Sequence, residues 1–264
     1  MPDLAIAVVF AVFIWWFSTG IVLLLNRMSG TAIRASLLVS SLLALAALAG
    51  LVQNAERATV GGAYCAFTCA LIVWGWHELS FLTGWITGPR KTALAADARG
   101  WHRFVESVRA ILWHEIGILV GGVLIIAITW NAPNQVGTGT FLVLWLMRTS
   151  AKLNLFFGVR NLSEEFLPSH LVYMKSFFRR RAFNLFFPFS IAGAGFVLVW
   201  LIFSATDAPA PAQGVGLALV GTMLALAILE HGLLVLPIDT TALWRWAIRR
   251  QVIHTAGEVS PSRR

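Results

Sequence analysis

The chain has 264 residues, of which 58% are hydrophobic and only 12% are charged. Soluble globular domains carry about 25% charged residues. This deficit and the long uncharged runs indicate a polytopic membrane protein and exclude a sizeable soluble domain. The net charge is +8. Membrane topology accounts for the excess of Lys and Arg, so we expect no nucleic-acid partner.

Seven apolar runs are long enough to cross a bilayer, which takes about 20 residues in a helix. We expect an all-α bundle of about seven transmembrane helices, with spans near residues 4–25, 35–54, 61–83, 104–130, 138–158, 186–206 and 214–236. The first run is too long for a signal peptide and lacks a basic segment before it, so we interpret it as the first span. Residues 1–236 then form the bundle, and residues 237–264 form a cytoplasmic amphipathic helix with a basic tail.

The loops alternate in their content of Lys and Arg. The connections after the first, third and fifth spans and the C-terminal tail are rich in these residues, whereas those after the second, fourth and sixth spans hold at most one each. Basic loops remain in the cytoplasm. We therefore expect the N-terminus in the periplasm and the C-terminus in the cytoplasm.

Two segments outside the spans, Leu167–Asn184 and Ile238–Ile253, interleave apolar and basic residues. This pattern predicts two interfacial helices that lie on the cytoplasmic face with their apolar sides toward the membrane. Their basic residues are candidates for binding anionic membrane lipid or a partner protein: Lys175, Arg179, Arg180, Arg181, Arg245, Arg249 and Arg250.

Three histidine–carboxylate pairs fall inside the predicted spans: His77-Glu78, His114-Glu115 and Glu230-His231. A charged group at the centre of a transmembrane helix costs about 2.5–3.5 kcal/mol on insertion scales, so such residues are functional candidates by default. The fifth span adds Arg148, Lys152 and Asn154. All lie in the cytoplasmic halves of their spans, which predicts that they meet in a cavity on that side. Adjacent helical residues differ by about 100°, so one member of each pair faces the cavity and the other faces a neighbouring helix.

Three interpretations of this cluster remain open. In the first it is structural: the three glutamates neutralise Arg148, Lys152 and Arg109, and the histidines form hydrogen bonds between helices. In the second it binds iron or zinc through His77, His114, His231, Glu78, Glu115 and Glu230, with Asn154 orienting the ligands. In the third, one of the histidines is the axial ligand of a tetrapyrrole.

A second polar stretch follows the fifth span and contains Ser163, Glu164, Glu165 and His170. Ser163 is a candidate N-cap of a short helix, with the two acids favoured at its positive end. The alternative is a lid over the cavity, formed by Glu164, Glu165 and His170. The chain contains no phosphate loop, no dinucleotide fingerprint and no nucleophile elbow, so ATP-driven transport and Rossmann-type redox chemistry are not expected.

Three stretches carry a resemblance to a known family: Trp15 to Gly20, Trp74 to Arg90, and Phe141 through Asn161–Pro168 to Arg181. In these the chain resembles the PuhE family, photosynthetic complex assembly proteins of purple phototrophic bacteria. The resemblance implies a multi-pass protein of the bacterial inner (cytoplasmic or intracytoplasmic) membrane. It also implies partners among reaction-centre subunits, light-harvesting subunits or other assembly factors. It supplies no catalytic residues.

We therefore expect an assembly factor that aids reaction-centre and light-harvesting assembly or supplies bacteriochlorophyll or a precursor, and we lean against an enzyme. The alternative is a membrane metalloenzyme that acts on a hydrophobic pigment or its precursor. A transporter is a third possibility, although no interrupted helices are repeated in two halves of the chain.

Overall fold

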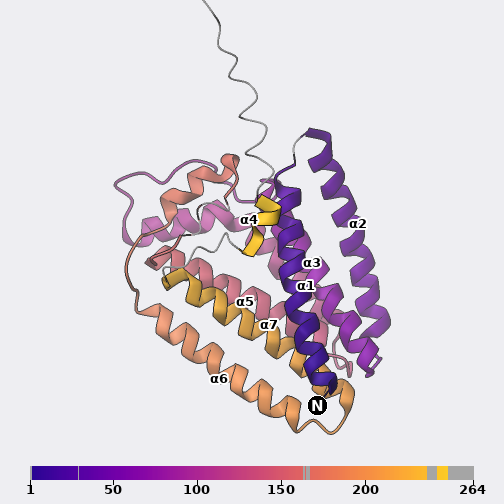
Figure 1. The fold of residues 1–264 in the computed structure, drawn as a ribbon. Coiled ribbons are helices and arrows are strands. Elements are labelled where there is room, and N and C mark those ends of the chain that lie inside the picture. Colours follow the sequence, from indigo (N-terminus) through magenta and orange to yellow (C-terminus); the bar gives the residue numbers. More distant parts are fainter. Residues whose placement is uncertain (1, 29, 163, 165–166, 237–242, 249–264) are drawn as a thin grey trace, which may run out of the picture.

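The computed structural model describes residues 2–28, 30–162, 164, 167–236 and 243–248, without the side chains of Arg245 and Ile248. Figure 1 shows a bundle of long helices. In chain order the elements are α1 (Pro2–Asn26), α2 (Gly30–Ala55), α3 (Val60–Leu82), α4 (Gly100–Ile128), α5 (Val136–Phe157), the 3₁₀ helix η2 (Ser169–Phe177), α6 (Phe186–Thr206), α7 (Pro211–Val235) and α8 (Arg245–Ile248). The described residues contain no strand, and a single parallel β-bridge joins Val159 to Arg180. The predicted all-α class is confirmed.

Each of the seven predicted spans corresponds to one long helix, and the largest difference is at the start of α2, which begins at Gly30. Six of these helices, α1 to α4, α6 and α7, are long and apolar enough to cross a membrane. The 22-residue α5 contains Arg148, Lys152 and Asn154, which make it more polar than the others. The chain therefore has the helices of a multi-pass membrane protein.

Helix α3 lies at the centre of the bundle, with 61% of its most apolar window buried. It packs against α1, α2, α4, α5 and α7, while α2 and α6 lie at opposite edges (Figure 1). Small residues on α3, among them Gly62, Ala63, Ala66 and Ala70, are buried. Small residues allow neighbouring helices to approach closely, which is how helices associate where no water drives them together.

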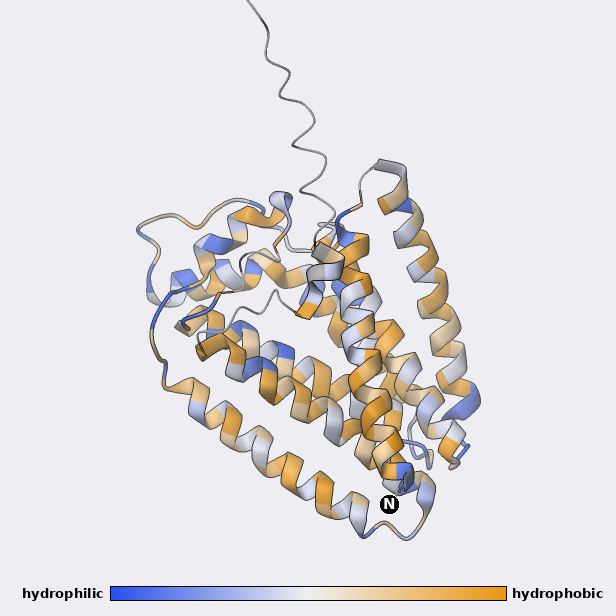
Figure 2. Cartoon of the chain, in the orientation of Figure 1, coloured by the Kyte–Doolittle hydropathy of each residue, from blue (hydrophilic) through white to orange (hydrophobic). Residues whose placement is uncertain are grey.

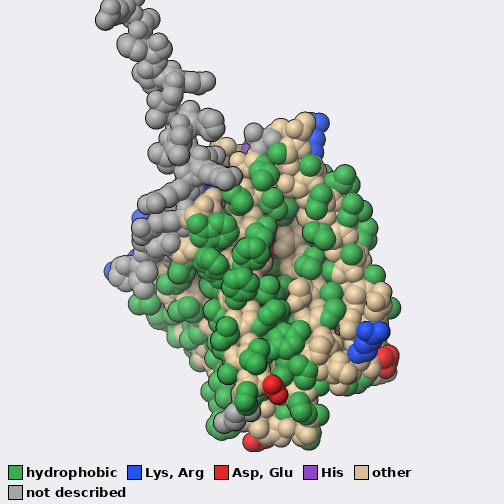
Figure 3. Space-filling view, turned by 45° about the vertical axis from the view of Figure 1, so that its right-hand side comes forward, with side chains coloured by type: hydrophobic (Ala, Val, Ile, Leu, Met, Phe, Trp, Pro, Cys, Tyr) green, Lys and Arg blue, Asp and Glu red, His purple; other side chains and the backbone are tan. Residues whose placement is uncertain are grey.

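The outside of the bundle is apolar along the length of the helices. Figure 2 shows hydrophilic residues concentrated in the loops and at the helix ends. On the face in Figure 3, charged side chains lie toward the ends and hydrophobic side chains cover the middle. Large side chains such as Leu38 of α2 and Phe196 of α6 are 63% and 77% exposed. A continuous apolar surface of this kind marks contact with a membrane.

The loop of residues 83–99 binds the side of α4. The amide of His114 donates to the carbonyl oxygen of Thr87 (2.9 Å), and the carbonyl oxygen of Arg109 accepts from the amide of Arg90 (3.4 Å). The buried Gly88 lies between these two contacts. A Cβ atom there would stand 2.1 Å from the carbonyl oxygen of Arg109, so the close approach of two backbones requires glycine.

Buried charges hold the same end of the bundle together. Glu106 of α4 is 5% exposed and forms ion pairs with Arg90 and Arg109. Arg103 is 4% exposed and donates to the carbonyl oxygens of Phe156 (3.0 Å) and Phe177 (2.6 Å). Its guanidinium also lies 3.9 Å from the ring centroid of Phe156. Arg103 thus links α4 to the ends of α5 and η2.

The prediction of an interfacial helix over Leu167–Asn184 was wrong in both the type and the length of the helix. The segment forms the shorter 3₁₀ helix η2, and residues 178–184 are not helical. The apolar residues Leu171 and Met174 are buried against Phe81 and Leu82 at the end of α3. Its apolar side therefore packs on the protein instead of the lipid.

Most of the second predicted interfacial helix, Ile238–Ile253, lies outside the described residues, as do Arg249 and Arg250. The described part ends in α8 and packs on α1. Trp244 and Ala247 are buried in a cluster with Leu23. The indole of Trp244 donates to the carbonyl oxygen of Trp16 (3.2 Å).

Substituting Gly88 with Ala should lower the free energy of unfolding by about 1–3 kcal/mol, because the added methyl group meets backbone that cannot turn away. Gly193→Ala on α6 is the control, since a Cβ atom there meets nothing within 4 Å. Its free energy of unfolding should be unchanged or higher by up to about 1 kcal/mol, the difference in helix propensity. Titration with a denaturing detergent measures both, and equal stability of the two variants would contradict the tight loop–helix contact.

Candidate functional site

A cavity of about 440 Å³ lies inside the bundle, at the end that carries the loops of residues 83–99 and 158–185. Helices α1, α3, α4, α5 and α7 form its walls, and η2 and Trp244 complete them. Pockets for small molecules usually measure about 300–1,000 Å³. The cavity thus has the size of a ligand site.

Apolar side chains make up most of the wall. Aromatic rings come from α1, α3, α5 and η2, and aliphatic and thioether groups come from α3, α4, α5 and α7. The larger ones are Trp15, Leu71, Trp74, Phe81, Leu82, Ile111, Leu144, Met147, Leu155, Phe156, Phe177 and Met223. Such a lining favours an apolar or aromatic ligand.

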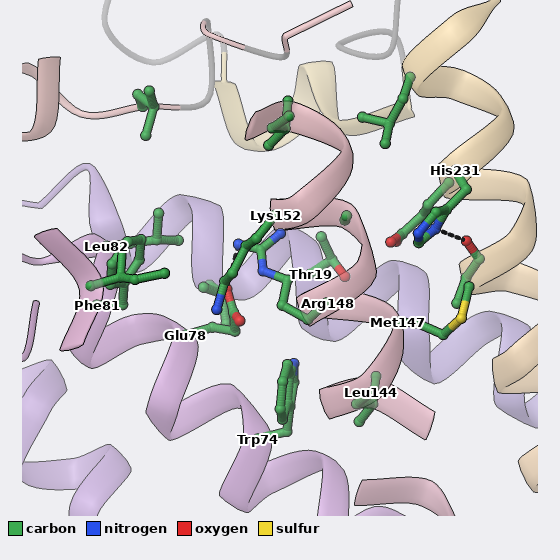
Figure 4. Close-up of a pocket in the computed structure, with 18 of the residues that line it drawn as sticks. Thr19, Trp74, Glu78, Phe81, Leu82, Leu144, Met147, Arg148, Lys152 and His231 are labelled. Atoms are coloured by element: carbon green, nitrogen blue, oxygen red, sulfur yellow. Dashed lines mark hydrogen bonds and ion pairs between the residues drawn. The ribbon is translucent and has the colours of Figure 1, made fainter. Parts of the chain in front are cut away.

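Two ion pairs cross between helices beside this apolar wall. A guanidinium nitrogen of Arg148 donates to a carboxylate oxygen of Glu78 at 2.9 Å. The ammonium of Lys152, one turn further along α5, pairs with Glu115 of α4. Figure 4 shows Glu78, Arg148 and Lys152 gathered close to Trp74. The Arg148 side chain remains 42% exposed because it faces the cavity. Glu78 and Glu115 therefore pair with two of the cations that the structural interpretation assigns to the glutamates.

The third carboxylate, Glu230 of α7, has a different partner. It accepts a hydrogen bond from the indole nitrogen of Trp15 at 3.0 Å. Among the described residues it forms no ion pair, and its side chain is open to the cavity that it lines. The predicted neutralisation of Arg109 by one of these glutamates is wrong, since Arg109 pairs with Glu106.

His231 also lines the cavity, but both of its ring nitrogens are engaged. Nδ1 bonds the carbonyl oxygen of Ala227 (2.9 Å) and Nε2 bonds the hydroxyl of Ser150 on α5 (3.0 Å). The ring is 2% exposed. His231 therefore joins α7 to α5, as the structural interpretation expects of a histidine, and offers no free nitrogen to a tetrapyrrole.

The other two histidines of the predicted cluster face away from the cavity. His77 is buried between the rings of Trp76 and Phe141, with centroids 4.9 and 6.1 Å away. It faces the small-residue stripe of α4, where a Cβ atom at Gly121 would lie 2.6 Å from its Nε2. Its neighbour Glu78 faces the cavity, which confirms the expected division of roles in that pair.

His114 is 1% exposed and its ring centroid lies 4.4 Å from that of Phe81. Its Nε2 has no hydrogen-bond partner in the described part of the chain. The hydroxyls of Thr87 and Tyr173 are also buried without a hydrogen-bond partner among the described residues, and burial raises the pKa of the Tyr173 phenol. His114 thus belongs to a buried polar group between α4, η2 and the loop of residues 83–99.

The six proposed metal ligands do not form one centre. Within the described ranges, no three or more His, Cys, Asp or Glu residues are gathered so that they could hold a metal ion. The separation follows from the helix packing, because His77 and His114 point toward α4 and Phe81 while Glu78 and Glu115 are held by cations on α5. The described residues therefore do not bring the six candidate ligands of the iron or zinc interpretation together in one place.

Asn154 does not line the cavity either. It is fully buried, and its amide donates to the carbonyl oxygen of Ser150 (3.0 Å) while its side-chain oxygen accepts from Asn184 (3.1 Å). Asn184 also donates to the carbonyl oxygen of Gly158 (2.8 Å). Asn154 therefore fixes the end of α5 to the start of α6 and does not orient a ligand.

The predicted lid residues are placed elsewhere. His170 contacts the carbonyl oxygen of Leu82 through Nε2 (2.9 Å) and lies against Gly84, so it caps the end of α3. Glu164 pairs with Lys175 (3.3 Å) and Arg180 (3.5 Å). Neither side chain lines the cavity. Ser163 and Glu165 lie outside the described residues.

The predicted basic residues of the first interfacial segment border the cavity from outside. Backbone hydrogen bonds join Arg179 to Leu155 and Val159, and Arg181 to Val159. Arg180 and Arg181 are exposed, and Arg179 and Lys175 are half-buried. Because Met174 and Phe177 of η2 line the cavity, this basic surface covers one wall of it.

Sequence reasoning missed two cavity residues that come from distant parts of the chain. Trp15 and Trp244 lie edge to face, with ring centroids 5.6 Å apart. Trp244 lies in the predicted interfacial segment Ile238–Ile253 and Trp15 in a stretch that carries the family resemblance, but neither was assigned to the cavity. Burial of Arg103 and Glu106 was also missed, because Arg103 falls in the connection just before the predicted span of residues 104–130 and Glu106 lies near the start of that span.

Replacing Arg148 with Gln should lower the free energy of unfolding by about 1–3 kcal/mol, because Glu78 is left without its counter-ion in a half-buried site. The double variant Glu78→Gln, Arg148→Gln should recover part of this loss. Glu164→Gln is the control, since its ion pairs are at the surface and should contribute less than about 1 kcal/mol. Strictly additive effects of the two single substitutions in a detergent titration would show that the pair is not coupled.

Comparison with known proteins places the chain in a family. The model of the family "Protein of unknown function (DUF3623)" matches residues 1–254. A protein of Rhodobacter capsulatus described as "Uncharacterized 30.4 kDa protein in puhA 5'region" is 38% identical over 241 residues, which cover 90% of this chain and 88% of that protein. No solved structure matches the chain. Since the family match extends over nearly the whole sequence, the chain belongs to the DUF3623 family.

Proposed function

We propose that this protein is an assembly factor of the PuhE type, which holds an apolar molecule inside the membrane while it meets subunits of a photosynthetic complex. The molecule would be bacteriochlorophyll or a precursor, and the subunits those of the reaction centre or the light-harvesting complex. In this proposal the protein resides in the bacterial inner membrane with seven spans, its N-terminus in the periplasm and its C-terminus in the cytoplasm.

The cavity of about 440 Å³ is the observation that carries the proposal. Its wall is mostly apolar, and its Arg148 and Lys152 are already paired with carboxylates. Sites for hydrophobic small molecules usually combine an apolar wall with a few polar groups that fix the orientation of the ligand. The lining therefore supports binding of a hydrophobic molecule.

The relative from Rhodobacter capsulatus gives the biological context. Its printed name places it in the puhA 5′ region, which is a photosynthesis gene region. Together with 38% identity over most of both chains, this supports a role in the photosynthetic apparatus for the present protein as well.

The position of the basic surface supports contact with partners. Lys175 and Arg179–Arg181 flank η2, which contributes Met174 and Phe177 to the cavity wall. In the proposed topology this surface faces the cytoplasm, where basic residues are retained. A partner bound there would lie beside the wall of the cavity, so loading and docking would occur at one end of the bundle.

Replacing Arg179, Arg180 and Arg181 together with Gln should weaken the capture of reaction-centre or light-harvesting subunits several-fold. In a phototrophic host that lacks its own copy, the same variant should lower the absorbance of the assembled complexes. The measurement is affinity purification of the tagged chain from solubilised membranes, followed by identification of the bound subunits.

Arg57→Gln is the control, because Arg57 is exposed in the short connection between α2 and α3, away from the cavity. It should leave capture and absorbance unchanged. Normal complex assembly in a host without any copy of the gene would contradict the proposed function. Normal assembly with the triple variant alone would contradict only the docking surface.

A further inference from the structure

The polar groups that line the cavity differ in whether they already have an ion-pair or hydrogen-bond partner within the protein. Arg148 and Lys152 each have a carboxylate partner, and both ring nitrogens of His231 are bonded. The hydroxyl of Ser18 donates to the carbonyl oxygen of Trp15 (3.3 Å), and that of Ser107 donates to the carbonyl oxygen of Arg103 (2.8 Å). Most of the polar groups in the lining therefore already form ion pairs or hydrogen bonds with other groups of the protein.

Among the described lining residues, Glu230 is the carboxylate without a cationic partner. Thr19 also lines the cavity, and Oε1 of Glu78 is buried there without a hydrogen-bond partner. A carboxylate offers two oxygens and about four acceptor sites, and the indole of Trp15 occupies one of them. The side chain is open to the cavity although it lies between α1, α5 and α7. Glu230 thus presents unused acceptor capacity to whatever fills the space.

The charges around the cavity are unequal. Glu78 and Glu230 line it with Arg148 and Lys152, and Glu115 binds Lys152 from outside. Three carboxylates therefore face two cations within one connected group. An anionic ligand finds no unpaired cation in this group.

We propose that the cavity binds an apolar, ring-containing molecule that is neutral or cationic and donates a hydrogen bond to Glu230. The apolar and aromatic wall holds the body of the molecule, and Glu230 fixes its polar end beside Trp15. Anionic amphiphiles of similar size should bind more weakly, because the two cations of the wall are already paired with carboxylates. This inference rests on the proposed function, in which the cavity holds an apolar molecule. It narrows that molecule to an uncharged precursor that carries an N–H or O–H donor, because the ring nitrogens of bacteriochlorophyll bind magnesium and its side groups offer only acceptors.

The chain offers a substitution that fills the cavity with little strain. Gly75 of α3 lines the cavity, and a Cβ atom there meets nothing within 4 Å. Leucine at this position would extend into the space beside Glu78 and Trp74. Gly193→Leu on α6 is the matched control, because its Cβ atom also meets nothing within 4 Å and it lies outside the cavity wall.

Two fluorescent probes with one ring skeleton test the charge preference. N-phenyl-1-naphthylamine is neutral and carries an N–H donor, and 8-anilinonaphthalene-1-sulfonate is the same skeleton with an added anion. Binding is followed in lipid nanodiscs by energy transfer from tryptophan, since Trp15, Trp74 and Trp244 line the cavity. Thermal unfolding of each variant shows that it is folded.

Saturable transfer to the neutral probe is expected in the wild type and in Gly193→Leu, and its loss is expected in Gly75→Leu. The sulfonate should bind at least tenfold more weakly. Glu230→Gln should weaken binding of the neutral probe by about tenfold, the effect of losing a hydrogen bond to a charged group. It should also reduce the difference in affinity between the neutral probe and the sulfonate.

Equal binding of the two probes, or no effect of Glu230→Gln, would overturn the inference while the loss in Gly75→Leu still supported an apolar site. Unchanged transfer in Gly75→Leu would instead remove the cavity as a binding site, and with it the holding role in the proposed function. The capture of photosynthetic subunits through the basic surface is measured separately, so the two failures are distinguishable.

Discussion

The ion pair between Glu78 of α3 and Arg148 of α5 is the constraint on which the arrangement of the bundle depends. A charged side chain inside a membrane is tolerated when it is paired and faces protein. Because α5 carries both Arg148 and Lys152, it must be surrounded by helices that supply carboxylates. Glu78 and Glu115 provide them from α3 and α4. The least apolar long helix therefore lies inside the bundle, while α2 and α6, which hold no such charges in their middles, lie at its edges (Figure 1).

The same pairing leaves a hollow beside it. The charged ends of Glu78 and Arg148 lie between helices that pack closely through small residues at other points along their length. Large apolar side chains line the space that is left beside the ion pair. At the loop end, Arg103 and the chain around Gly88 hold α4, α5 and η2 together. A rigid frame around an apolar cavity, bordered by basic residues, is the physical basis for combining storage of a hydrophobic molecule with docking of a partner.

Much of this could be predicted from the sequence. The positions of the seven long helices follow from runs of apolar residues, since burying backbone in lipid requires continuous helices. The charged residues of the spans were also expected to lie at one end, and five of them do line the cavity: Glu78, Arg148, Lys152, Glu230 and His231. Whether these residues share a metal centre could not be predicted from the sequence. The ligands would come from different helices, and the spacing of residues along the chain does not determine how each helix is rotated about its axis.

The sequence by itself determined which segments are helical and apolar and where the charges fall along them, because both depend on local composition. Tertiary structure alone decided that His77 faces Gly121 and Glu78 faces the cavity, because neighbouring helices select one side of each turn. It also placed Trp244 against α1, more than 220 positions away along the chain, and turned the expected interfacial helix into part of the cavity wall. These contacts join segments that are remote in sequence, and packing of side chains against one another decides them.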